Sequence, residues 1–158
     1  MELEERAKQV LEDRIKRIRD FSKLQPDHPF AVANKHMLDL STQTKWDSTG
    51  TINMTGVVWW ALNVSLALGY PNSVIFNATG GPDFDFAIFT SLVTGSFFVD
   101  PSTLGGECNF SMEAVAGGEG EVSLNFYDMN WSQTGTFLGA VGGVSLSKVS
   151  GSGNITYE

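Results

Sequence analysis

Apolar and polar residues alternate along both arms of a segment that runs from Cys108 to Asp128. Successive side chains of a strand point to opposite faces, so this period of two predicts one apolar face and one wet face. The glycine-rich stretch 116–120 between the arms can adopt the positive φ of a tight turn. The pattern predicts an antiparallel β-hairpin, and because an isolated hairpin is marginally stable, we expect it to belong to a larger sheet. The apolar residues are Phe110, Met112 and Ala114 in the first arm and Val122, Leu124 and Phe126 in the second.

Strand signals continue from Thr49 to the end of the chain. Short strands at close spacing, with Gly, Pro, Asn and Asp between them, are typical of a sandwich or barrel. No helical segment of the length that a crossover needs lies between them, which excludes a parallel α/β sheet. About eight strands fit a small closed antiparallel barrel, which is filled by its own side chains or holds one small ligand. The expected strands are 51–59, 63–69, 73–78, 84–91, 93–99, 108–115, 121–128, 136–146 and 148–157, with the third and fourth joined tightly through residues 79–82.

Glycines inside these strands support closure of the barrel. In a strand, glycine costs stability unless the chain bends sharply or another backbone comes close, and a small barrel requires repeated bends. The spacing is not GxGxxG and no helix follows, so we do not interpret these glycines as a phosphate loop. They are Gly95, Gly139, Gly142, Gly143, Gly151 and Gly153.

Residues 2–24 show a different period, with apolar side chains three and four residues apart, which predicts an amphipathic helix that Pro26 ends. A helix of this length is marginal alone, so we expect its stripe to pack on the barrel or on a second copy of the chain. A membrane surface or partner protein is the alternative. Residues 27–42 are expected to hold a second short helix with Asp27 as N-cap and Pro29 in its first turn, or to be a connector. The stripe consists of Leu3, Ala7, Val10, Leu11, Ile15, Ile18 and Phe21.

Charge divides the chain near the start of the β region. Residues 1–45 hold nine of the ten Lys and Arg against eight acids, or +1, and residues 46–158 hold Lys148 against ten acids, or −9. All 17 glycines lie after residue 49. We therefore expect a helical N-terminal extension over 1–45 and a β-barrel domain over 46–158. A body this acidic repels phosphate backbones, so nucleic acid is not an expected partner.

The charged N-terminus shows no secretory signal. Residues 1–20 lack the apolar core of a signal peptide, which leaves a cytoplasmic protein or one whose signal has been removed. The chain contains no run of about 18 apolar residues, so no transmembrane helix is predicted.

Residues that carry catalysis are sparse in the β region. Residues 46–158 contain no His and no Arg, so a Ser-His-Asp triad or a histidine zinc site would need His28 or His36 folded over the barrel. Asp83 and Asp85 share a strand face and are candidates for a calcium site or an acid–base pair. Such pairs are more often the wet side of a strand. We expect no enzymatic activity and no catalytic, metal or cofactor site.

Cys108 is the single cysteine, which excludes an intramolecular disulfide and a multi-cysteine metal site. At the head of a strand, it is interpreted as a packed side chain rather than a reactive thiol.

Six Asn-x-Ser/Thr triplets occur in the β region. They are glycosylation acceptors if the protein is secreted by a eukaryote. Because residues two apart share a strand face, a polar outer face also generates the triplet without any such role, and we favour this origin. The triplets begin at Asn53, Asn63, Asn77, Asn109, Asn130 and Asn154.

Two pairs of adjacent aromatic residues interrupt the simple alternation. Trp59 and Trp60 point to opposite faces of their strand, so at most one enters the core and the other is exposed or covered by helix 2–24. Phe97 and Phe98 repeat the arrangement. These outward aromatics are the candidate binding residues, or the dock of the N-terminal helix.

The order of strands and glycines resembles the Rhodococcus-type virulence-associated (Vap) protein family over about residues 50–158. The resemblance implies an eight-stranded barrel of two Greek keys without an open ligand cavity. It also implies a secreted, non-enzymatic protein that acts on the host phagosome or endolysosomal pathway through surface interactions, and it carries over no catalytic residues. A lipocalin-like barrel that binds a small ligand, or a cytoplasmic structural or interaction protein, are the alternatives. The resemblance is carried by residues 74–81, Phe89 and Phe97, and residues 109–115, 124–128, 135–139, 142–144 and 151–153.

Overall fold

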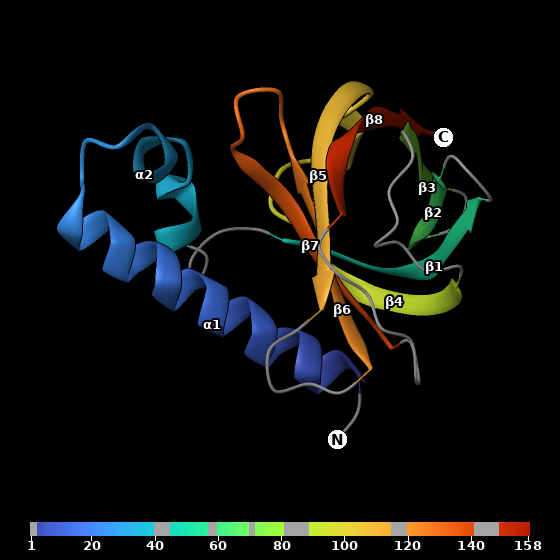
Figure 1. The fold of residues 1–158 in the computed structure, drawn as a ribbon, viewed down its shortest axis with the longest axis horizontal. Helices are drawn as coiled ribbons and strands as arrows, with labels where there is room; N and C mark the ends of the chain where they lie inside the picture. Colours follow the sequence, from blue (N-terminus) through green and yellow to red (C-terminus); the bar gives the residue numbers. More distant parts are fainter. Residues whose placement is uncertain are drawn as a thin grey trace.

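Eight antiparallel strands form a closed barrel, and a helical segment precedes it (Figure 1). The computed structural model describes residues 3–39, 45–56, 60–69, 72–80, 89–114, 120–140 and 149–158. The strands are β1 Trp46–Gly56, β2 Trp60–Gly69, β3 Asn72–Gly80, β4 Phe89–Phe97, β5 Gly106–Ala114, β6 Glu121–Tyr127, β7 Gln133–Ala140 and β8 Val149–Tyr157. A short 3-10 helix, Pro101–Thr103, follows β4.

The order around the barrel is β1-β2-β3-β8-β5-β6-β7-β4. Each half of the chain places its fourth strand beside its first, in the order 4-1-2-3 for β1–β4 and 8-5-6-7 for β5–β8, which is the Greek-key arrangement. Closure pairs every strand on both sides and so leaves no open sheet edge. The predicted closed antiparallel barrel and its Greek-key topology are confirmed.

The structure corrects the predicted strand boundaries around β4. Residues 93–99 and the end of 84–91 form one strand, because Phe89–Phe97 pairs without interruption along β1 from Met54 to Trp46. Leu92, left out as a break, is an outward residue of that strand and is 70% exposed. The same pairing starts β1 at Trp46, before the predicted Thr51. The structure does not describe residues 81–88 or 141–148, where parts of the predicted strands lie.

Five phenylalanine rings fill the barrel interior, and each is no more than 2% exposed. The rings of Phe76 and Phe126 lie 5.0 Å apart, centroid to centroid, in the edge-to-face geometry that aromatic pairs favour. Aliphatic or sulfur-containing side chains from every strand except β7 complete this core. The interior is thus packed by the barrel's own side chains. The five residues are Phe76, Phe97, Phe110, Phe126 and Phe137.

Two of the in-strand glycines lie where backbones approach closely. A Cβ atom at Gly95 would lie 2.1 Å from the carbonyl oxygen of Thr136, and one at Gly153 would lie 2.4 Å from that of Asn77. Both distances are far below van der Waals contact, so a larger residue would push neighbouring strands apart. The predicted role of these glycines in tight strand contacts is confirmed here, whereas Gly142 and Gly143 lie outside the described residues.

The N-terminal extension consists of α1 Leu3–Leu24, α2 Pro29–Ala33 and a 3-10 helix, η1 Lys35–Asp39. Figure 1 shows α1 lying along the outside of the barrel, where it contacts β4 and β7. Asp27 is not the N-cap of α2; His28 is, because Pro29 occupies the first helical position and makes the residue before it the cap. Among the described residues, no helix is long and apolar enough to span a membrane.

Candidate binding surfaces

The structure places few of the sequence-predicted site residues in a position to act. Trp59, Asp83 and Asp85 lie outside the described residues, and for Trp60 the structure describes the backbone at the start of β2 but not the side chain. Within the described part of the chain, no group of three or more His, Cys, Asp and Glu side chains is arranged to hold a metal ion.

Both histidines make structural contacts, His28 within the extension and His36 with the barrel. The His28 Nδ1 atom accepts a hydrogen bond from the Phe30 N–H at 3.1 Å, which caps α2. The His36 Nε2 atom lies 2.6 Å from the Gln133 carbonyl oxygen, which ties η1 to β7. The extension does fold over the barrel, but these contacts give both rings structural positions.

The Phe97–Phe98 pair behaves as its sequence pattern predicts. Phe97 enters the barrel core, and Phe98 points outward and is 1% exposed. Phe98 packs with Leu11 and Ile18 of α1 and with Met37 of η1. The outward aromatic is therefore the dock of the N-terminal helix.

Polar contacts surround this apolar dock. The Arg14 guanidinium donates to the Gln133 side-chain oxygen and, over 2.5 Å, to the Tyr127 hydroxyl, and it lies 5.7 Å from the centre of the Tyr127 ring. Nearer the N-terminus of the helix, Arg6 pairs with Glu121 at 2.9 Å. Sequence reasoning missed Arg14 because a single Arg in a charged helix carries no signal of a partner more than 100 residues away.

Asn34 and Gln133 link the extension to β7 through buried hydrogen bonds, and both residues are fully buried. The Gln133 N–H donates to the Asn34 Oδ1 atom at 2.9 Å, and the Asn34 amide donates to the carbonyl oxygens of Phe30 and Trp131. The Gln133 side chain donates in turn to Asn125 at 3.0 Å. The extension is therefore held by polar networks as well as by apolar packing.

Beyond Asp47 at the start of β1, the outer face of β1, β2, β3 and β8 contains no charged side chain among the described residues. Its residues are exposed or half-buried and are mainly Ser, Thr and Asn. Core residues alternate with them, and the strand register aligns them in rows across the sheet. We name this surface the uncharged face. Its residues are Thr49, Thr51, Asn53, Thr55, Ala61, Asn63, Ser65, Ala67, Ser73, Ile75, Asn77, Thr79, Ser150, Ser152, Asn154 and Thr156.

One row of the uncharged face consists of four asparagines on neighbouring strands. Asn53 pairs in register with Asn63, Asn63 with Asn77, and Asn77 with Asn154. The Asn63 amide donates to the Asn77 Oδ1 atom at 2.6 Å. Each of these asparagines has its Ser or Thr two residues later on the same face, which is the arrangement that a polar outer face predicts. Asn109 differs, because it is buried.

Two hollows lie on the outside of the barrel. One, of about 420 Å³, lies between α1 and the strands β1 and β4. Two of its polar groups already have partners: the Ser96 hydroxyl donates to Asp47 at 2.5 Å and the Ser48 hydroxyl donates to the Ala67 carbonyl at 2.6 Å.

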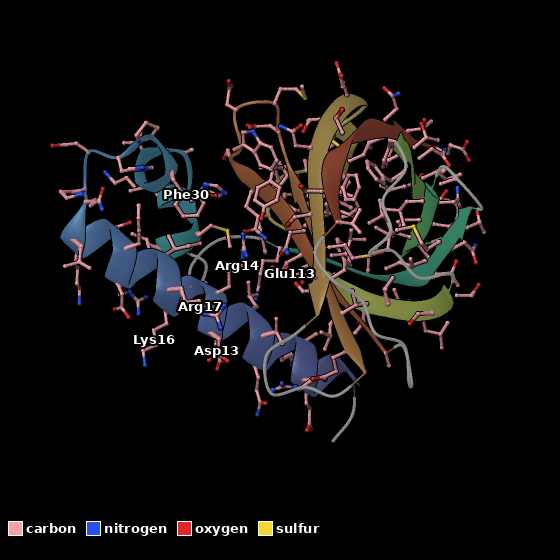
Figure 2. All side chains as sticks on the ribbon, viewed as in Figure 1. Asp13, Arg14, Lys16, Arg17, Phe30 and Glu113 are labelled. Carbon is pink, nitrogen blue, oxygen red and sulfur yellow. The ribbon has the colours of Figure 1, made fainter. Side chains whose placement is uncertain are left out.

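The second hollow, of about 510 Å³, opens between α1 and the start of α2. We call it the interhelical cleft. Its apolar wall consists of Ile18, Phe21 and Phe30, and its polar groups are those of Arg14, Arg17 and His28. The rings of Phe21 and Phe30 lie 5.5 Å apart and nearly perpendicular. Figure 2 labels Arg14, Arg17 and Phe30, which come from the two helices.

Cys108 is 5% exposed and packs in the barrel core. Burial, with a smaller contribution from the negative charge of Glu107, raises the pKa of the Cys108 thiol to about 12. The thiolate is the nucleophilic form, so near neutral pH this side chain is a packed, unreactive group. The predicted packing role is confirmed.

No family model matches the chain, and no curated protein matches it. Among solved structures, the chain is similar to the virulence-associated protein VapB from the intracellular pathogen Rhodococcus equi, at 16% sequence identity and a TM-score of 0.48. The match covers 73% of this chain and 96% of the VapB chain. VapB belongs to the family that the pattern of strands and glycines in the sequence resembles.

Proposed function

We propose that this protein is a non-enzymatic barrel that acts through its outer surface on the phagosome or endolysosomal pathway of a host cell. The observation that carries the proposal is the uncharged face, which spans four strands of a chain with a net charge of −8. The centres of protein interfaces are depleted of charged residues, because an ion loses its hydration when a partner covers it. A broad exposed face of hydroxyl and amide groups therefore favours a partner protein. The host-directed part of the proposal rests on the Vap resemblance of the sequence pattern.

The packed interior argues against the lipocalin-like alternative. A calyx needs an empty interior, whereas Phe76, Phe110 and Phe126 meet inside this barrel at ring-to-ring distances of 5.0 to 5.4 Å. Burial of the Cys108 thiol likewise removes the one cysteine from any surface chemistry. Both observations support a function on the outside of the molecule.

The test adds one positive charge to the uncharged face. Purified protein is delivered to cultured macrophages, and the size and acidity of their lysosomes are measured by fluorescence microscopy. We expect the unaltered protein to enlarge or de-acidify these compartments and Asn77→Lys to lose most of this effect. Asn130→Lys is the matched control, because Asn130 is also exposed but lies in the turn between β6 and β7.

Two results would contradict the proposal in different ways. An inactive unaltered protein would remove the host-directed role and favour a structural or interaction protein of the cytoplasm. Equal activity of Asn77→Lys and Asn130→Lys would leave the host effect in place and remove the uncharged face as its cause.

A further inference from the structure

We infer that the interhelical cleft binds a small organic anion with an aliphatic body, of the class of medium-chain fatty-acid carboxylates. The cleft belongs to the helical extension and lies apart from the uncharged face, so this inference goes beyond the proposed function. Its volume of about 510 Å³ falls within the range of ordinary ligand sites.

The polar side chains that line the cleft are hydrogen-bond donors. Arg14 and Arg17 carry guanidinium groups, which donate and cannot accept. Nδ1 of His28 accepts from the Phe30 N–H, so the neutral imidazole carries its proton on Nε2 and is a donor there. A lining that donates from three side chains is complementary to an acceptor, and a carboxylate offers two acceptor oxygens with a negative charge.

Neither Arg14 nor Arg17 forms an ion pair with a carboxylate of the described residues. Arg14 bonds to the neutral groups of Gln133 and Tyr127, and Arg17 forms no hydrogen bond or ion pair with any described side chain. Figure 2 shows Arg14 on the barrel side of α1, with Asp13 and Lys16 on the opposite side. The N-terminal residues 1–45 carry a net charge of +1, while residues 46–158 carry −9.

The apolar lining of the cleft favours a ligand with an apolar body. Among the lining residues, Ile18 is 3% exposed and Phe30 is 37% exposed. The Phe21 ring lies edge-on to His28 at 5.0 Å and to Phe30 at 5.5 Å, which fixes the wall before any ligand arrives. Covering Phe30 would remove apolar surface from water, and an inorganic anion cannot provide that burial.

Isothermal titration calorimetry with laurate tests this assignment on the full chain. We expect laurate to bind at one site, and acetate and the cationic dodecyltrimethylammonium to bind at least about tenfold more weakly, because each lacks one half of the complementarity. Arg17→Gln should weaken laurate about tenfold, which corresponds to about 1.4 kcal/mol. Phe30→Ala should weaken it to a similar extent.

Lys16→Gln is the matched control, since it removes the same charge from the exposed side of α1 that faces away from the barrel. Its laurate affinity should equal that of the unaltered protein, and circular dichroism should show that every variant is folded. Equal weakening by Lys16→Gln and Arg17→Gln would overturn the site in favour of general charge attraction. Absence of laurate binding would overturn the inference itself.

The same carboxylate-like charge can also come from a lipid headgroup, so a second arm uses vesicles with and without anionic phospholipid. Binding to the anionic vesicles without binding of monomeric laurate would overturn the small-molecule site and assign the basic cleft to a membrane surface. Neither binding experiment involves the uncharged face. Absence of laurate binding would therefore not affect the macrophage result, and a negative macrophage result would not affect the proposed ligand site in the cleft.

Discussion

Two sides of this barrel present similar polar side chains, and one of them is buried. On β1, β2, β3 and β8 the outward Ser, Thr and Asn residues lie in or near solvent. On β4, β6 and β7 one set of outward residues lies on the side that the helical extension covers and is no more than 8% exposed, whereas Leu92, also outward on β4, is 70% exposed. The buried set is Thr94, Ser96, Ser123, Asn125, Tyr127, Thr134, Thr136 and Leu138.

The difference shows what a polar face needs before it can be covered. Beneath the extension, Asn125 accepts hydrogen bonds from Gln133 and Thr136 and donates to Ser123, so its amide is satisfied without water. The apolar dock around Phe98 supplies the burial that favours association of the extension. The uncharged face contains no outward aromatic among its described residues, and the extension does not cover it.

The largest expected effect comes from placing a charge in the apolar dock. Ile18 is 3% exposed against Phe98. Ile18→Asp forfeits about 1.5–3 kcal/mol of burial and adds the cost of a desolvated carboxylate, so we expect α1 to leave the barrel. Limited proteolysis should then cut within residues 3–24, and binding of an apolar dye should increase.

The control for this change is Val32→Asp, because Val32 is 62% exposed on α2. It should leave the proteolysis pattern and dye binding unchanged. Equal protection of α1 in Ile18→Asp and in the unaltered protein would show that the apolar dock does not hold the helix. The dock would then not explain why one polar face is covered and the other is open.

A smaller effect is expected from the polar link between the extension and β7. Asn34→Ala leaves the buried Gln133 N–H without its acceptor, which costs about 1–3 kcal/mol. Urea denaturation should show the loss, whereas Asn154→Ala on the uncharged face should change the stability by less than about 0.5 kcal/mol. Equal losses would mean that the Asn row of the open face is as structural as the buried link.

The smallest effect concerns the Thr134 hydroxyl, which is buried without a hydrogen-bond partner in the structure. Thr134→Val removes this unpaired group, so the free energy of unfolding should stay constant or rise by up to about 1 kcal/mol. Thermal denaturation measures this change. Thr79→Val, at an exposed position of the uncharged face, should not increase the stability in the same measurement. A clear loss at Thr134 would show that water or another partner satisfies the hydroxyl on the covered side as well.

The pattern of the chain predicted the barrel and the first helix because both depend on local periodicity. Alternation over 108–128 identified β5 and β6, and spacings of three and four identified α1. The predicted strand boundaries were wrong where pairing with a distant strand decides them, as at the start of β1 at Trp46 and within β4 at Leu92. The sequence predicted Asp27 as the N-cap of α2. Because Pro29 is the first helical residue, the cap is the residue directly before it, His28.

The sequence by itself determined which faces of the strands and of α1 are apolar, that no His or Arg lies in residues 46–158, and that the basic residues gather before residue 46. The tertiary structure decided which polar face is covered, since α1 meets β4 and β7 rather than another side of the barrel. It also decided that Arg14 and Phe30 line one cleft. The physical reason is that periodicity records the side to which a residue points, whereas the partner on that side depends on contacts between elements as far apart as Asn34 and Gln133.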